Sequence, residues 1–154
     1  MKTVPLLSGC VLQPAQAKDV WAIRALVLRA FLDPTQLQWS QFWVLVYEDR
    51  IIGCGQLRQF DDAQELGSLV IAPAWRDRGL GTFLVHHLIA QASFPLYLEC
   101  LGERLYQYYQ RLGFETADWS QLPPGMQRKF KQTRAIATVL KLPLHILHYR
   151  NQEP

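Results

Sequence analysis

The residues best suited to chemistry form a short turn that combines two arginines with two closely spaced glycines. The turn follows the apolar run Leu69–Ile71, and its key residues are Arg76, Arg78, Gly79 and Gly81. If a helix begins at the glycines, the N–H groups of its first turn lack intrahelical partners, and the helix dipole adds about half a positive charge there. Because glycine has no Cβ, a phosphate can come against this backbone, and arginine suits phosphate oxygens. The pattern therefore predicts a phosphate-binding site.

The spacing of the glycines separates three kinds of phosphate site. A P-loop requires a lysine directly after its last glycine, and no lysine follows Gly81. A dinucleotide-binding turn requires a third glycine, where this chain has Leu84. What remains is R-x-x-G-x-G, directly after a strand that ends at Pro73. This pattern resembles the acyl-CoA-binding motif of the GNAT family of N-acetyltransferases.

A second motif, Tyr109–Phe114, resembles the Y-x-x-x-G-F signature that closes the last core helix of GNAT enzymes. The resemblance implies that Tyr109 protonates the departing CoA sulfur. A thiol pKa of about 8.5 and a phenol pKa of about 10 make that transfer feasible. The alternative is that Tyr109 only packs under the pantetheine arm; Tyr106, one turn earlier, is the substitute donor. Many members carry an asparagine seven residues before this tyrosine, and here Gly102 replaces it, so that cofactor contact is missing or supplied otherwise.

The resemblance implies an acyl-CoA-dependent N-acetyltransferase that uses acetyl-CoA and no metal, and transfers the acetyl group directly within a ternary complex. It implies that the backbone of Leu69, Val70 and Ile71 holds the pantetheine like an added strand. It also implies that the pyrophosphate is held by the following turn, through Arg76, Asp77, Arg78, Gly79, Leu80, Gly81 and Thr82.

Transfer to an amine requires a neutral amine, and two glutamates are candidate general bases. An α-amine with a pKa of about 8 costs roughly 1.4 kcal/mol to deprotonate at pH 7, whereas a lysine with a pKa of about 10.4 costs more than about 4 kcal/mol. Glu65 opens the strand before the glycine turn, where several GNAT enzymes place a glutamate that works through water. The alternative is that Glu65 is only a solvent-exposed residue at the end of a strand. Glu99 is the second candidate, and it reads equally as an ordinary polar residue of a sheet.

The sequence indicates the identity of the acetyl acceptor mainly through the C-terminal segment. Leu122–Lys129 resembles the C-terminal end of N-acetylglutamate synthase domains, where a Leu-Pro pair precedes a lysine-rich helix. Residues 120–154 hold six of the sixteen basic residues and one of the thirteen acidic ones, which suits the carboxylates of an amino acid. We therefore expect a small amino-acid or amine acceptor. The alternatives are a protein N-terminal or lysine acetyltransferase, and a catalytically idle CoA-binding or partner-binding module.

Composition limits the remaining possibilities. The 154 residues, 49% hydrophobic and 19% charged, fit a single domain spanning 1–154, with a core at about 10–142 and a short C-terminal tail. No apolar run is long enough for a membrane span, the N-terminus lacks the pattern of a signal peptide, and no motif for nucleic acid is present, so we expect a cytoplasmic protein. Its three cysteines, Cys10, Cys54 and Cys100, are predicted to be buried free thiols. A homodimer is compatible with the family, but the sequence does not decide the oligomeric state.

Hydrophobic periodicity predicts an α+β domain built on one mixed sheet. The order and spacing of the elements resemble the GNAT fold, and this resemblance implies about four helices flanking a mixed, mostly antiparallel central sheet of six to seven strands. Strands are predicted at 11–13, 42–47, 51–60, 64–71, 95–100, 114–119 and 135–142. Helices are predicted at 17–31, 79–92, 103–112 and 126–134, and a tail at 143–154. Gly53 and Gly55 inside one strand indicate a bulge or a close backbone approach.

Overall fold

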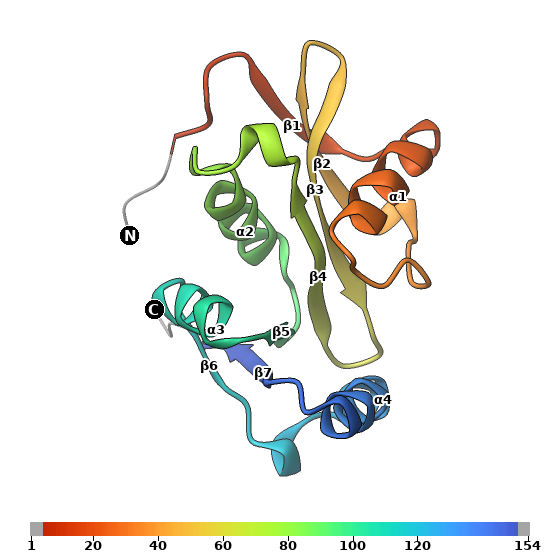
Figure 1. Cartoon of the computed structure of the whole chain (residues 1–154), viewed down its shortest axis with the longest axis vertical. Coiled ribbons are helices and arrows are strands. Elements are labelled where there is room, and N and C mark those ends of the chain that lie inside the picture. The colour runs from red at the N-terminus through yellow and green to blue at the C-terminus, as the bar shows by residue number, and fades with distance from the viewer. Residues whose placement is uncertain (1–4, 151–154) are drawn as a thin grey trace. The chain divides into compact units, whose positions relative to one another are not determined.

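Seven strands and four α-helices are formed by residues 5–150, the part of the chain that the computed structural model describes (Figure 1). Hydrogen bonding links the strands into a mixed sheet in the order β1-β2-β3-β4-β5-β7-β6, which confirms the predicted fold class. Within the described residues the chain divides into two compact units. The N-terminal unit comprises the residues up to Arg58 together with Leu66–Gln91, and the C-terminal unit comprises Gln59–Glu65 and the residues from Ala92 onward.

The N-terminal unit packs α1 against the first strands of the sheet. Its elements are β1 (Cys10–Pro14), α1 (Val20–Arg29), β2 (Phe42–Tyr47), β3 (Arg50–Gln59), most of β4 (Gln64–Ile71) and α2 (Leu80–Gln91). Short 3-10 turns lie at Ala17–Asp19, Trp39–Gln41 and Pro73–Trp75. β2 is antiparallel to both β1 and β3. Ile23 and Val27 of α1 are buried in one cluster with Phe42, Val44 and Cys54, so removal of this apolar surface from water fixes the helix on the strands.

The structure explains why β3 contains the two glycines Gly53 and Gly55. The β2–β3 register shifts after the pair Leu45–Gly53, which marks a bulge at that point. A Cβ at Gly55 would lie 2.8 Å from Leu88 Cδ1 of α2, a separation too short for two carbon atoms. The bulge, one of the two alternatives predicted from the sequence, is therefore present, and the close neighbours of Gly55 are side chains rather than backbone.

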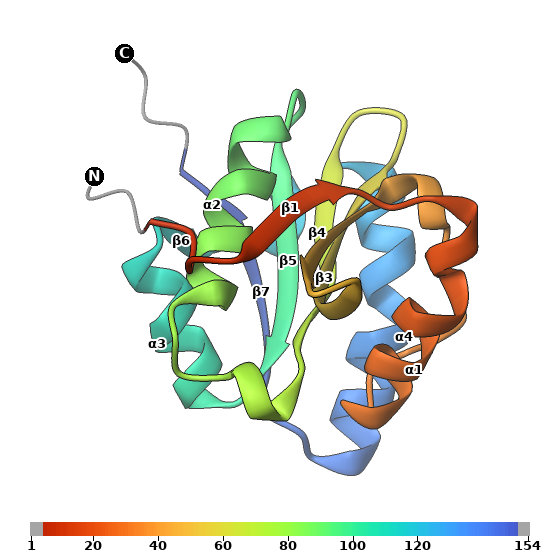
Figure 2. The same ribbon diagram turned by 90° about the horizontal axis from the view of Figure 1, so that it is seen from above.

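In the C-terminal unit, three strands pair in an antiparallel way, and one helix lies on each face of these strands (Figure 2). Its elements are β5 (Leu96–Leu101), α3 (Glu103–Arg111), β6 (Phe114–Thr116), a 3-10 turn (Trp119–Gln121), α4 (Pro124–Leu140) and β7 (Leu144–Tyr149). His145 of β7 stacks on Tyr106 of α3, whereas the next residue, Ile146, packs with the α4 cluster. Because neighbouring strand residues point to opposite faces, α3 and α4 cover opposite sides of β7.

Two predictions near the C-terminus are wrong. Residues 135–142, expected as a strand, continue α4 as far as Leu140, and residues 144–149, expected as a tail, form β7. The helix ends because Lys141 adopts a left-handed conformation with φ of 53°, and the Leu142 N–H donates to the Ala137 carbonyl at 2.8 Å. The predicted strand 114–119 is also shorter, because it gives way to the 3-10 turn at Trp119.

Two further features of the chain are the burial of its cysteines and the character of its helices. Cys10, Cys54 and Cys100 are all buried free thiols, as predicted. Burial raises the pKa of Cys54 to about 12 and that of Cys100 to about 11, so both thiols are unreactive near neutral pH. Among residues 5–150, no helix combines the length and the apolar character needed to cross a membrane.

Candidate active site

Two candidate bases, Glu65 and Glu99, are brought together in the C-terminal unit by a lysine that the sequence analysis did not single out. Lys129 Nζ donates to Glu65 Oε1 at 2.8 Å and to Glu99 Oε1 at 3.0 Å. Thr133, one turn further along α4, donates to Glu99 Oε1 at 3.4 Å. We call Glu65, Glu99 and Lys129 the carboxylate–lysine cluster.

Strand pairing and helix geometry build this cluster. β4 and β5 run parallel, with Glu65 opposite Tyr97, and Glu99 lies two residues after Tyr97 on the same face of β5. Lys129 and Thr133 are four residues apart in α4, so they project from the same face of that helix. Burial of Met126 and Phe130 in the apolar cluster of this unit turns that face toward β5. Apolar packing therefore aims the lysine at both carboxylates.

The cluster is a buried electrostatic unit that contains two carboxylates and one ammonium group. The side chains of Glu65, Lys129 and Glu99 are 1%, 11% and 21% exposed. Burial raises the pKa of Glu99, the nearby Glu65 adds to that increase, and the charge and hydrogen bond of Lys129 oppose it. Glu99 Oε2 is buried and has no hydrogen-bond partner among the described residues. The surroundings of Glu99 therefore favour its protonated form.

The side chain of Tyr109 is buried among aromatic rings, and its hydroxyl group holds its proton more tightly than a free phenol does. Tyr109 is 7% exposed and packs edge-on against Tyr108 and Phe114. Burial raises its pKa above the usual value for a phenol, so the hydroxyl group stays protonated at neutral pH. Tyr106, the predicted substitute, already has its hydroxyl group in a 2.9 Å hydrogen bond with Thr116.

The glycine turn in the N-terminal unit has the predicted local structure. β4 ends at Ile71, the chain turns through Pro73–Trp75, and α2 begins at Leu80, with the N–H of Phe83 donating to the Gly79 carbonyl at 3.0 Å. Gly79 has a φ of 78°, a conformation that glycine adopts at little cost. The helix thus begins one residue after the predicted start.

The arginines of the turn are exposed and also fix its shape. Arg76 Nε donates to the Ile71 carbonyl at 3.0 Å, and Arg78 donates to the Ala74 carbonyl at 3.3 Å. The Arg78 guanidinium also lies 4.9 Å from the centre of the Trp75 ring. Each arginine makes bonds to the turn and remains accessible to a ligand. Together with the first N–H groups of α2, this arrangement can hold an anion of the pyrophosphate class.

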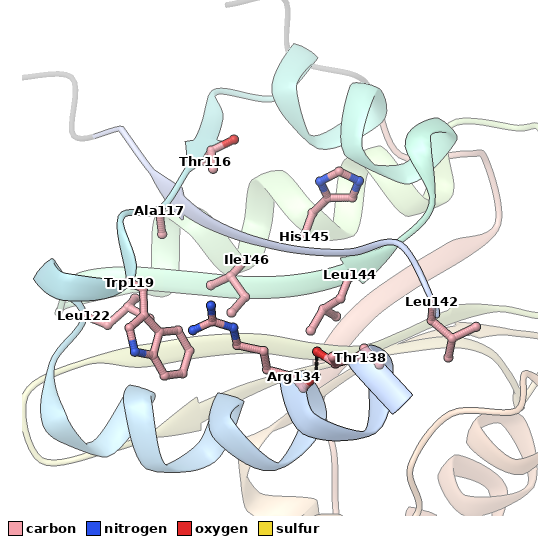
Figure 3. Close-up of a pocket in the computed structure, with 11 residues that line it drawn as sticks. Thr116, Ala117, Trp119, Leu122, Arg134, Thr138, Leu142, Leu144, His145 and Ile146 are labelled. Atoms are coloured by element: carbon pink, nitrogen blue, oxygen red, sulfur yellow. Dashed lines mark hydrogen bonds between the residues drawn. The ribbon is translucent and has the colours of Figure 1, made fainter. Parts of the chain in front are cut away.

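A cavity of about 350 Å³ lies within the C-terminal unit, between α4 and β7 (Figure 3). The Arg134 guanidinium lies 4.6 Å from the centre of the Trp119 ring beside this cavity, and Thr138, His145 and Ile146 complete much of its wall. The cavity therefore combines an aromatic surface with a cation. Sequence reasoning missed both this cavity and Lys129, because neither residue spacing nor composition indicates which side of α4 faces the sheet.

Comparison with known proteins places the chain in a family. The model of the acetyltransferase (GNAT) domain matches residues 38–116, and the chain belongs to this family. The "Amino-acid acetyltransferase" of Neisseria meningitidis serogroup A is 26% identical over 110 residues, which cover 69% of this chain and 25% of that protein. The Shewanella oneidensis protein of the same name is 27% identical over 115 residues, covering 72% of this chain and 26% of its own length. The chain thus spans about a quarter of the length of these curated relatives.

Solved structures share the fold. N-acetylglutamate synthase from Neisseria gonorrhoeae, complexed with coenzyme A and N-acetyl-glutamate, superposes with a TM-score of 0.76 and 22% identity, over 96% of this chain and 36% of that one. Rv2747 from Mycobacterium tuberculosis, also in complex with CoA, gives a TM-score of 0.67 and 20% identity, over 90% of this chain and 98% of that one. At these identities the likeness establishes a common fold.

Proposed function

We propose that this chain is an acyl-CoA-dependent N-acetyltransferase that moves the acetyl group of acetyl-CoA to the amine of a small amino acid. The observation that carries the proposal is the placement of Glu65 in a GNAT-family chain. This carboxylate is 1% exposed and lies at the second position of β4, the strand that leads into the glycine turn. A buried carboxylate held by a cation is costly to maintain, and deprotonation of an amine provides a reason for keeping it.

The acetyl donor, acetyl-CoA, binds at the glycine turn and at the end of β4. The backbone of Leu69–Ile71 takes the pantetheine arm, and residues 76–82 take the pyrophosphate. Three features support this assignment: the exposed arginines, the left-handed Gly79 and the first N–H groups of α2. Tyr109 acts at the sulfur.

The reaction balances with two proton transfers by side chains. Glu65 accepts a proton from the acceptor ammonium, directly or through water, and the neutral nitrogen attacks the thioester carbonyl carbon. As the new C–N bond forms and the C–S bond breaks, Tyr109 donates its proton to the departing sulfur. The amide nitrogen loses its second proton to solvent, Glu65 releases the proton it accepted, and Tyr109 recovers one from solvent. The products are an N-acetylated amine, free CoA and one released proton.

An amino acid is the acceptor class best supported by the C-terminal unit. The relatives above are amino-acid acetyltransferases, and the cavity between α4 and β7 offers the guanidinium of Arg134 to a carboxylate. Stacking of that guanidinium on Trp119 keeps its N–H edge available for such a bond.

The test is acetyl-CoA turnover with a panel of amines. The panel contains free amino acids, their amides, simple amines and peptides with a free N-terminus or an internal lysine; product identity is checked by mass spectrometry. We expect N-acetylation of one or more free amino acids, and loss of turnover when the carboxylate is amidated. Turnover with peptides alone would assign a protein acetyltransferase instead. CoA binding without turnover of any amine would show a binding module.

A further inference from the structure

Arg134 gives the cavity between α4 and β7 a positive charge that is free to bind a ligand. Its guanidinium group lies 4.6 Å from the centre of the Trp119 ring and makes no hydrogen bond or ion pair within residues 5–150 (Figure 3). Arginine stays charged at every working pH, and its planar group binds a carboxylate through two parallel N–H bonds. His145 points to the other face of β7, where its ring stacks on Tyr106 with the ring centres 4.3 Å apart. The cavity therefore offers a fixed positive charge to one carboxylate.

Beyond Arg134, the wall of the cavity is largely apolar. Leu144 and Ile146 alternate with His145 along β7, so both project toward α4 (Figure 3). Among the described residues that line the cavity, none carries a carboxylate or an amine group. A second charged group on a ligand would therefore lose its water against this wall without gaining a partner, which is costly. An apolar side chain in the same place would be removed from water, which is favourable.

The cavity lies beside the carboxylate–lysine cluster. Ile146, which lines the cavity, is paired with Glu99 across β7 and β5. On α4, Arg134 directly follows Thr133, which donates to Glu99 Oε1 at 3.4 Å. These two links place the cavity and the cluster at neighbouring positions along α4. The cavity volume of about 350 Å³ is near the lower end of the range for small-molecule sites, so it suits one amino acid better than a peptide.

We propose that this cavity selects a free amino acid with a single carboxylate and an apolar side chain, and that it discriminates against dicarboxylic amino acids. Arg134 binds the carboxylate, and the side chain packs along Leu144 and Ile146. This proposal rests on the proposed function, because it takes the cavity as the site of the acceptor. It goes further than that function, since it states which side chains the acceptor carries and which residues choose among them.

Binding measured without turnover tests this selectivity. The intact chain is saturated with CoA, which carries no acetyl group, and is titrated by calorimetry with leucine, leucinamide, glutamine and glutamate. Glutamine and glutamate have nearly the same size, so this pair isolates the effect of the side-chain charge. We expect leucine to bind at least about tenfold more tightly than glutamate, with glutamine between them. Leucinamide, which lacks the carboxylate, should bind more weakly than leucine.

Three variants connect the selectivity to the cavity. Thr138→Lys adds a cation to the cavity wall at an exposed position of α4, so it should narrow the gap between glutamate and leucine several-fold. Gln132→Lys adds the same charge at an exposed position of α4 that does not line the cavity, and as the matched control it should leave the gap unchanged. Arg134→Gln removes the carboxylate partner, so leucine and leucinamide should then bind alike.

The outcomes separate this inference from the proposed function. The inference is overturned if glutamate binds the wild-type chain as tightly as leucine does, if Thr138→Lys and Gln132→Lys give the same ratio, or if none of the amino acids binds. Leucine binding with the expected responses, but without acetylation from acetyl-CoA, would reject the proposed function and leave the selectivity of the cavity standing. Acetylation of an amino acid with a kcat/KM that Arg134→Gln does not change would keep the function and reject the cavity as the acceptor site.

Discussion

Replacement of Glu65 by glutamine is the sharpest test of the proposed chemistry. A glutamine side chain has nearly the same volume as glutamate and an oxygen that still accepts from Lys129 Nζ, so the fold and the 2.8 Å contact are expected to survive. The variant loses the capacity to take a proton together with the negative charge that faces Lys129. A positioned general base contributes about 10²- to 10⁴-fold to the rate, which corresponds to about 3–5 kcal/mol of barrier.

The defect is expected to depend on pH in a defined direction. In the variant the acceptor must reach the site already neutral, and an α-amine with a pKa of about 8 is about one-tenth neutral at pH 7. The variant's kcat/KM should therefore rise about tenfold per pH unit up to about pH 8 and then level off. The ratio of wild-type to variant kcat/KM shrinks over this range, because the base matters less as the free amine becomes abundant.

The assay follows loss of the thioester absorbance of acetyl-CoA from about pH 6 to 9, with thermal unfolding measured for each variant. Glu103→Gln, at an exposed position on α3, is the matched control and should keep wild-type kinetics. An unchanged kcat/KM in Glu65→Gln would refute the base assignment. A defect of constant size at every pH would equally refute it, because that result indicates lost positioning.

Three further predictions concern the donor site, the leaving group and the core. Gly79→Val places a branched side chain at a φ of 78°, so CoA binding measured by calorimetry should weaken at least tenfold while the circular dichroism spectrum is retained; full affinity would count against the turn as the pyrophosphate site. Tyr109→Phe should lower kcat more than it changes the affinity for CoA, and an equal loss in both would indicate a packing role alone. Phe130→Ala removes a fully buried side chain from the cluster beneath α4 and should lower the free energy of unfolding by about 3–5 kcal/mol in urea titrations; a loss below about 1 kcal/mol would contradict the packing described above.

Local sequence patterns predict most of the helices and strands correctly. They fail where the end of a helix or strand depends on packing against other parts of the chain. β2 and β4 match their predicted bounds, because turn residues flank each apolar run. Residues 135–142 contain Ile136 and Val139, whose β-branched side chains favour strands, yet both stay exposed on α4 while Ala137 is buried. A helix already begun at Pro124 continues at little cost per residue, and that continuation outweighs the local preference.

The candidate site shows the same division between local and long-range information. The glycine turn is contiguous in sequence, so its residues could be identified from spacing alone. The contact between Glu65 and Lys129 joins residues 64 positions apart, and a lysine on an amphipathic helix is ordinarily a solvated surface residue. Only the packing of Met126 and Phe130 turns Lys129 inward, and that packing is a property of the folded unit.

The size of the Glu65→Gln defect also distinguishes the acceptor classes that the fold leaves open. Deprotonation at pH 7 costs about 1.4 kcal/mol for an α-amine and about 4.6 kcal/mol for a lysine side chain, a difference of roughly 250-fold. If the acceptor is an amino acid, the variant's kcat/KM rises about tenfold above its value at pH 7 and levels off near pH 8, within the pH range in which most proteins are stable. If it is a lysine, the variant's kcat/KM would still be rising at about pH 9, because the amine itself remains charged. The pH at which the variant's profile levels off therefore reports the pKa of the acceptor amine.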